Sequence, residues 1–173
     1  MTILTTQRLR LEPITEAHYE RMRELNTDPE VMTYLNGGQP ETEDVTRAAL
    51  KRITTRWAEW SYSWWMLLDR HDGRMIGMAC LQHLDGDRSK PHEIGWRLAR
   101  AGWGQGYASE AAQAIVAHAF EVVGAPEVVA VADAANAASI KVMTRLGMQY
   151  AGQQRHYDGD CVAYRLARPA YSS

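Results

Sequence analysis

The stretch that decides the fold is Glu93-Ile-Gly-Trp-Arg-Leu98, followed three residues later by Gly102-Trp-Gly-Gln-Gly-Tyr-Ala-Ser-Glu110. This pattern predicts a strand, a glycine-rich turn and the start of a helix. The first amide groups of a helix have no carbonyl partner, and the peptide dipoles make that end partly positive. Gly104 and Gly106 can adopt positive φ and leave no Cβ in the way of a ligand. The turn therefore predicts a site for a phosphate-bearing ligand.

Two common phosphate-binding motifs fit this turn poorly. A P-loop ends in Gly-Lys-Ser/Thr, and this chain has no such tripeptide. A dinucleotide-binding turn has a third glycine where Ser109 stands. Asp133, at the end of the next apolar run, could still act as the ribose-binding acid of such a site. A nucleotide-binding oxidoreductase therefore stays open as an alternative.

Four pieces of the chain, the glycine turn included, resemble the GNAT acetyltransferases and stand in the family's order. Gly106-Tyr-Ala108 resembles the core of the family's coenzyme A loop, and Asn136-Ala-Ala-Ser139 with Arg145-Leu-Gly-Met148 resembles its second cofactor helix. Thr6-Gln-Arg-Leu-Arg-Leu11 and Asp28-Pro-Glu-Val-Met-Thr-Tyr-Leu35 resemble the N-terminal half of the ribosomal-protein-serine/alanine N-acetyltransferase-like branch. The resemblance covers nearly the whole chain and implies an acetyl-CoA-dependent N-acetyltransferase.

Composition agrees with one domain, residues 1–173, that has a real core. The chain has 173 residues, of which 46% are hydrophobic and 23% charged. The net charge of −2 and the scattered basic residues argue against nucleic acid as a partner. The sequence has no membrane-span pattern and no signal-peptide pattern, so we expect no membrane partner and a cytoplasmic protein. Cys80 and Cys161 should be reduced thiols, and the six scattered histidines predict no metal site.

Periodicity predicts an α+β fold. We expect strands at 9–11, 64–68, 75–84, 92–98, 128–131, 148–156 and 161–166, and helices after Thr15, after Asp28, from Glu43, at 107–123 and at 136–146. The helix from Glu43 should bury Val45, Ala49, Ile53, Trp57 and Trp60. The last two strands should turn at Asp158-Gly-Asp160. The element order matches a single-domain GNAT fold with a mixed, mostly antiparallel sheet and helices on both faces. A bulge at Gly95 should splay the sheet at the cofactor slot.

By this resemblance, acetyl-CoA lies on the glycine turn and along the strand before it. The amides from Gln105 to Ser109 would hold the pyrophosphate, and the strand 94–98 would pair with the pantetheine arm. Trp103 stands where many family members have Gln or Arg, which leaves the backbone to hold the phosphates. The expected cofactor contacts are Ile94, Gly95, Trp96, Leu98, Trp103, Gly104, Gln105, Gly106, Tyr107, Ala108, Ser109, Asn136, Ser139, Lys141 and Arg145.

Some of these residues have an ordinary structural alternative. Asn136 is also a preferred helix N-cap, and the cap and the cofactor contact can coexist through different atoms. Lys141 and Arg145 lie one turn apart and could reach the 3′-phosphate, or form a solvated basic face.

Two residues are candidates for proton transfer. Glu93 opens the strand beside the expected thioester and is the candidate general base; a surface ion pair is the alternative role. His92 points to the opposite face of that strand. In the resembling branch, the serine at position 139 gives a proton or hydrogen bond to the leaving thiolate. Met143 stands where many other family members have a tyrosine, which favours Ser139, although a hydrogen bond within its own helix is the alternative.

The acceptor is expected to be a primary amine, either a protein N-terminus or a small molecule. The chain has six tryptophans and one phenylalanine. By resemblance, Tyr34, Trp57 and Trp64, together with Glu93, border the acceptor site, although core packing competes for the tryptophans. A non-catalytic acyl-CoA-binding module is a second alternative function. The oligomeric state stays open, with a homodimer as one option.

Overall fold

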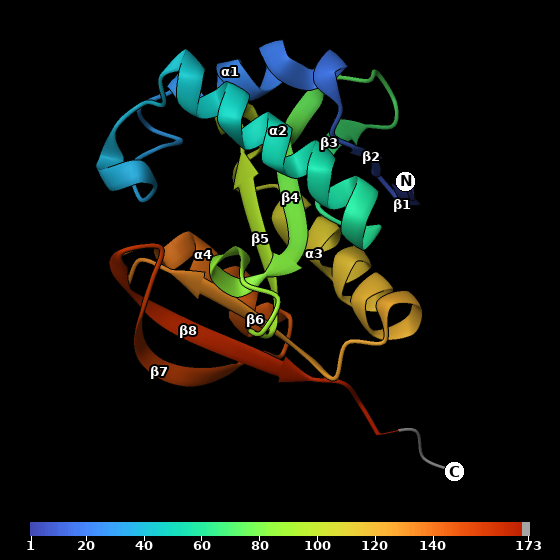
Figure 1. The fold of residues 1–173 in the computed structure, drawn as a ribbon, viewed down its shortest axis with the longest axis vertical. Helices are drawn as coiled ribbons and strands as arrows, with labels where there is room; N and C mark the ends of the chain where they lie inside the picture. The colour runs from blue at the N-terminus through green and yellow to red at the C-terminus, as the bar shows by residue number, and fades with distance from the viewer. Residues whose placement is uncertain (171–173) are drawn as a thin grey trace.

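The computed structural model describes residues 1–170, and one sheet runs through them (Figure 1). The strands and α-helices, in chain order, are β1 (Leu4–Thr5), β2 (Leu9–Pro13), α1 (Tyr19–Thr27), α2 (Glu43–Trp60), β3 (Trp64–Asp69), β4 (Met75–His83), β5 (His92–Leu98), α3 (Tyr107–His118), β6 (Glu127–Ala132), α4 (Ala137–Arg145), β7 (Gln149–His156) and β8 (Gly159–Ala167). In the described part of the chain, no helix is long and apolar enough to cross a membrane.

The sheet has eight strands in the order β1-β2-β3-β4-β5-β6-β8-β7. All neighbours are antiparallel except β5 and β6, which are parallel and pair only through His92 with Val128 and Glu93 with Val129. Beyond Glu93 the two strands diverge: β5 runs toward the α1–α2 layer while β6 runs across the molecule (Figure 1). The prediction of a mixed, splayed sheet is confirmed. The dinucleotide-binding alternative is wrong, because that fold needs a mostly parallel sheet.

The splay does not come from a bulge at Gly95, so that prediction is wrong. Strands β4 and β5 pair without a register shift from Gly77 with Leu98 to His83 with His92. Gly95 lies opposite Cys80 in this ladder, and a Cβ on it would stand 3.2 Å from the Cys80 sulfur. The glycine therefore makes room for a buried thiol. The gap arises instead because β6 leaves β5 after two residues.

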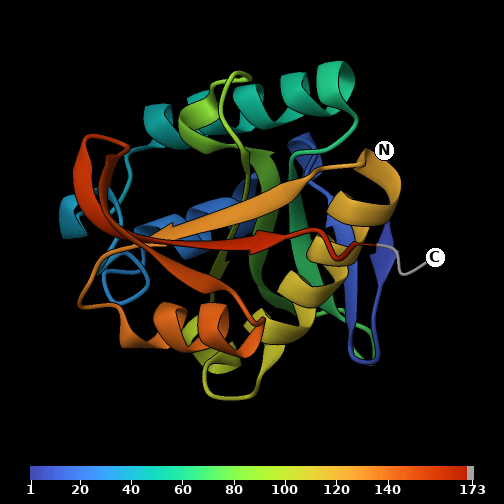
Figure 2. The same cartoon turned by 90° about the horizontal axis from the view of Figure 1, so that it is seen from below.

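Helices cover both faces of the sheet, as predicted. Figure 2 shows α2 on one side of the strands and α3 and α4 on the other, and α1 packs against α2. The core between these layers centres on fully buried residues of the middle strands, such as Trp65, Leu67, Leu81 and Ile94. Helix α2 begins at an N-cap, Thr42, whose hydroxyl accepts from the amide of Val45.

The buried face of α2 differs from the predicted stripe. Its buried residues are Thr46, Leu50, Ile53 and Trp57, whereas Val45 is 44% exposed. Thr46 is buried because its hydroxyl bonds to the Glu41 carboxylate. A hydrogen-bonded threonine, Thr46, thus takes the buried position on α2 that the prediction gave to Val45.

Two local predictions need correction. Asp28 starts only one helical turn, with the Met32 amide bonded to its carbonyl, and the chain then continues as turns. The last hairpin turns at Tyr157 and Asp158, both at positive φ, so that Gly159 already belongs to β8. The helix predicted over residues 107–123 is present, as α3 to His118 followed by a π-helical turn, Ala119–Val123.

Candidate active site

The glycine turn before α3 has the geometry that an anion site needs. Gly104 and Gly106 have φ of 72° and 81°, and Gly106 is the N-cap. The first helical bond joins the Glu110 amide to the Gly106 carbonyl. The amides of Tyr107, Ala108 and Ser109 therefore have no carbonyl within the helix. Among the described residues, the buried Ser109 hydroxyl also has no hydrogen-bond partner. Unpaired donors at a helix N-terminus suit a phosphate group.

A residue that the sequence analysis missed, Arg8, fixes this turn. Its Nη1 donates to the Gln105 carbonyl at 2.9 Å, and its Nε donates to Glu110 at 2.7 Å. The guanidinium also lies 4.3 Å from the centroid of the Tyr107 ring. Thr6 adds a bond to the same Glu110 carboxylate at 2.6 Å. The loop between β1 and β2 thus holds both sides of the turn.

Two other side chains near the turn also hold neighbouring segments in place. Trp103 is 45% exposed and donates from its indole to the Leu98 carbonyl. Arg100 forms ion pairs with Asp28 at 2.8 Å and Glu30 at 2.7 Å. These contacts tie the segment after α1 to the segment before α3.

Strand β5 and helix α4 border the gap next to this turn. No strand among residues 1–170 pairs with the Ile94–Leu98 edge that faces β6. Helix α3 packs against both β5 and α4. Asn136 caps α4, because its side-chain oxygen accepts from the Ser139 amide at 3.1 Å. The Ser139 hydroxyl forms no hydrogen bond with any described residue, and its side chain is half-buried. The Ser139 hydroxyl and the open strand edge thus belong to two elements, α4 and β5, that both pack against α3.

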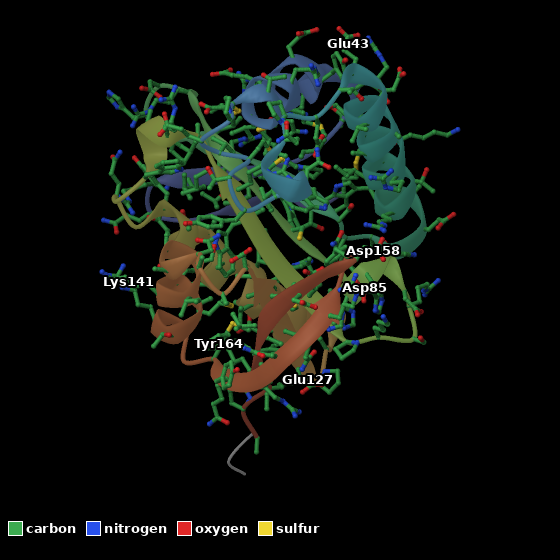
Figure 3. All side chains as sticks on the ribbon, turned by 90° about the vertical axis from the view of Figure 1, so that its left-hand side faces the viewer. Glu43, Asp85, Glu127, Lys141, Asp158 and Tyr164 are labelled. Carbon is green, nitrogen blue, oxygen red and sulfur yellow. The ribbon has the colours of Figure 1, made fainter. Side chains whose placement is uncertain are left out.

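The exposed face of α4 carries the two predicted cations. Lys141 and Arg145 are both exposed, and neither has an ion pair within the described chain. Figure 3 shows Lys141 on the outer side of α4, away from Asp85 and Asp158. Asp133, the ribose-binding candidate, instead caps the turn before α4 by accepting from the Ala135 amide.

Glu93 is the most unusual residue of the site, because it is a carboxylate that is only 6% exposed. Its Oε2 accepts from the Gln82 amide at 2.9 Å and from the Tyr157 hydroxyl. Gln82 is itself held by two donors to its Oε1: Arg56 at 2.7 Å and the Trp64 indole at 3.1 Å. The surface ion pair considered for Glu93 is absent from the described structure, and a buried network takes its place.

Burial sets the acidity of Glu93. Burial raises the pKa of Glu93 above its usual value, and the bonds from Gln82 and Tyr157 partly lower it again. A carboxylate with a raised pKa is a better proton acceptor than an exposed one. His92, on the opposite face of β5, bonds to the Tyr62 hydroxyl at 2.9 Å. Burial beside His83 lowers the pKa of His92 to about 4, so it is neutral near pH 7.

The predicted acceptor residues lie in three different environments. Trp64 belongs to the Glu93 network through Gln82. Trp57 is 3% exposed, packs edge-on against Trp65 and donates to the Trp64 carbonyl, so it supports Trp64 from the core. Tyr34 is exposed on the turns that follow α1. Of the residues that sequence reasoning missed, Gln82 carried a signal: it is a polar residue inside an apolar strand.

Comparison with known proteins identifies the family. Residues 8–149 match a family model described as an acetyltransferase (GNAT) domain. The chain belongs to the GNAT acetyltransferase family. It is an acetyl-CoA-dependent N-acetyltransferase, with acetyl-CoA as its donor substrate, as its sequence resemblance implied. The described residues contain no group of three or more His, Cys, Asp or Glu side chains that could hold a metal ion.

Relatives agree with this family assignment. The chain is 32% identical over 160 residues to the FsC-acetyl coenzyme A-N(2)-transacetylase of Aspergillus fumigatus, covering 85% of this chain and 65% of the relative. An acetyltransferase from Agrobacterium tumefaciens has a similar structure, with a TM-score of 0.83, 26% identity and coverage of 96% and 94%. RimL, a ribosomal L7/L12 alpha-N-protein acetyltransferase solved with coenzyme A, shares the fold at a TM-score of 0.78 and 19% identity, with coverage of 96% and 98%.

Proposed function

We propose that this chain transfers the acetyl group from acetyl-CoA to a primary amine by direct attack in a ternary complex. The observation that carries the proposal is Glu93: a buried carboxylate held by two donors at the point where β5 leaves β6. A buried carboxylate is costly, and perturbed groups of this kind concentrate at functional sites. We also propose that residues 1–173 form a single acetyltransferase domain.

The residues on the α3 and α4 side would bind the donor. The amides from Gln105 to Ser109 would hold the pyrophosphate, and the open β5 edge at Ile94, Gly95, Trp96 and Leu98 would pair with the pantetheine arm. The Asn136 side-chain nitrogen remains available for a contact, since only its oxygen is used in the cap. Lys141 and Arg145 carry positive charges that have no ion-pair partner among residues 1–170, and these charges would bind the 3′-phosphate of the coenzyme.

Two groups of the chain would move protons. Acetyl-CoA supplies the activated thioester, so no covalent intermediate on the protein is needed. Glu93 takes the proton from the attacking amine, directly or through water, and Ser139 donates a hydrogen bond or proton to the departing thiolate. General acid–base help of this kind is worth about 10²–10⁴-fold in rate.

The acceptor would be either a protein N-terminus or a small-molecule amine. The relative from Aspergillus fumigatus is named for N(2) acetyl transfer from acetyl coenzyme A, which supports nitrogen as the acceptor atom. Trp64 and Tyr34 are the aromatic residues that border the acceptor in this proposal.

Free-thiol release from acetyl-CoA across an amine panel tests the proposal. The panel holds peptides beginning with Ser, Ala or Met, polyamines, aminoglycosides and free amino acids, beside a sample without acceptor. Turnover on peptides alone would identify a protein N-terminal acetyltransferase, and turnover on one small amine would identify a small-molecule enzyme. Acetyl-CoA binding without turnover on any amine would overturn the proposal and favour a binding module.

A further inference from the structure

The tip of the β7–β8 hairpin reaches across the molecule to the Glu93 site. Figure 3 shows Asp158 of this tip beside Asp85, which follows β4. The Tyr157 amide donates to Asp85 Oδ1 at 2.8 Å, and His156 Nδ1 lies 2.7 Å from Asp85 Oδ2. Lys90 neutralises the same carboxylate at 2.6 Å. The hairpin is therefore fixed to the turn after β4, and it carries Tyr157 with it.

The conformation of this tip favours a specific role for Tyr157. Both turn residues, Tyr157 and Asp158, have positive φ, of 52° and 61°. Such turns normally place Gly or Asn at these positions, and the chain has Gly159 immediately after them. A shift by one residue would put the glycine in the turn, but would move Tyr157 to the other face of the hairpin. Unfavourable backbone at a functional position is retained when other contacts compensate for it.

The contacts of the Tyr157 hydroxyl determine where its proton points. The oxygen accepts from the Gln82 amide at 3.0 Å and from the Asp85 backbone amide at 3.1 Å. With two donors already aimed at its oxygen, the hydroxyl has one proton left, and that proton goes to Glu93 Oε2. Although Tyr157 is 53% exposed as a residue, its hydroxyl is thus fully committed inside the site.

The same directional logic fixes the whole network. Arg56 and Trp64 donate to the Gln82 oxygen, so the Gln82 nitrogen must face Glu93. Both described donors to Glu93 therefore converge on one carboxylate oxygen, Oε2. The other oxygen, Oε1, accepts no hydrogen bond from any residue between 1 and 170.

We propose that Tyr157 is a positioning residue for Glu93: it occupies Oε2 as a fixed donor and leaves Oε1 to take the proton of the acceptor amine. This inference rests on the proposed role of Glu93 as the base. It assigns to the β7–β8 hairpin a part in the reaction, and it distinguishes the two oxygens of the carboxylate.

The substitution Tyr157→Phe isolates the hydroxyl, because the ring and the backbone bond to Asp85 remain. It also leaves the other titratable or charged groups around Glu93 in place. These are Arg56 of α2, Cys80 of β4, Asp85 of the turn after β4, His156 of β7 and Cys161 of β8. Tyr150→Phe is the matched control, since Tyr150 lies on the same hairpin against Tyr164, outside the Glu93 network.

Carbon-13 NMR of the Glu93 carboxyl group, assigned by its loss in Glu93→Gln, measures the effect without any turnover. Loss of a hydrogen bond to an ionised group should move the titration of Glu93 upward by about one to two pH units in Tyr157→Phe. Tyr150→Phe should leave it unchanged. An unchanged Glu93 titration in Tyr157→Phe would overturn the proposal.

Turnover adds a second readout. At a fixed pH below the midpoint of the wild-type Glu93 titration, Tyr157→Phe should lower kcat by about ten-fold or more, because less of Glu93 is ionised. This loss of kcat should shrink as the pH rises and Glu93 becomes ionised in both proteins. An increase in kcat/KM would show instead that Tyr157 obstructs the acceptor, and would overturn the proposal. If Glu93→Gln keeps full activity, the proposed base is wrong, whatever the NMR titration of Tyr157→Phe shows.

Discussion

Replacing Arg8 with alanine should weaken acetyl-CoA binding although Arg8 lies about a hundred residues before the glycine turn in the sequence. In the folded protein its side chain bonds to the Gln105 carbonyl and to Glu110, and stacks on Tyr107. Without it, the bound ligand must order the turn itself, and that ordering reduces the binding free energy. The Glu110 carboxylate, still held by Thr6, would also stay beside the proposed pyrophosphate site without its counter-charge.

The size of the effect follows from these contacts. The Arg8 side chain is 40% exposed, so its ion pair with Glu110 contributes less than about 1 kcal/mol after solvent screening. The cation–π contact at an exposed site adds about 0.5–1 kcal/mol. Together they amount to about 1.4 kcal/mol, which is about ten-fold in the Kd for acetyl-CoA.

Calorimetric titration with acetyl-CoA measures this change. Arg10→Ala is the control, because Arg10 lies two residues after Arg8, in β2, and its ion pair is with Glu12 at 2.6 Å, away from the glycine turn. Adding Glu110→Gln to Arg8→Ala should recover about two- to three-fold of the lost affinity, since it removes the uncompensated charge. Equal Kd values for Arg8→Ala and Arg10→Ala would refute the reasoning.

Four further predictions concern three residues of the site, Glu93, Ser139 and Gly106. Glu93→Gln should lower kcat by about 10²–10⁴-fold and leave the Kd for acetyl-CoA within two-fold of wild type. The control Glu127→Gln should keep full activity. A wild-type rate in Glu93→Gln would remove Glu93 from the mechanism. Because burial raises the folded-state pKa of Glu93, its ionisation destabilises the folded protein as the pH rises. Glu93→Gln should therefore have a higher melting temperature than wild type at pH 8, and the difference should vanish near pH 4. A difference in melting temperature that does not change with pH would contradict this sign. Ser139→Ala should lower kcat by about ten-fold without changing the melting temperature, and a fall in stability instead would mark Ser139 as structural. Gly106→Val should weaken acetyl-CoA binding more than Gly124→Val, although both glycines have positive φ, because only Gly106 lies at the proposed phosphate site.

The strand, turn and helix start of the proposed donor site could be predicted from the sequence because they are nearly contiguous. The strand from Glu93, the turn at Gly104 and Gly106 and the start of α3 follow one another within 18 residues, so local rules reach all of them. Asn136 was predicted as a cap on the same local grounds, and the cap is present. In these segments the local preferences and the tertiary structure agree.

The rest could not be predicted because it depends on long-range contacts. Arg8 meets Glu110 across 102 positions, and Tyr157 meets Glu93 across 64. No periodicity connects such pairs. Gly95 shows a different limit: a glycine inside a strand indicates either a bulge or a close approach, and only the structure shows that the close approach is to Cys80.

The division between predictable and unpredictable parts follows the chemistry of the two substrates. The donor offers phosphates and an extended amide-bearing arm, which backbone groups of one strand and one helix can bind without special side chains. The proton acceptor needs one carboxylate with a defined free oxygen, and that definition requires donors converging from several directions. Here the donors come from β4 and from the tip of the β7–β8 hairpin, and α2 orients one of them through Arg56. The proposed amine-activating side of the site is therefore a property of the assembled fold, and residues 149–167 contribute to it through the Tyr157 hydroxyl.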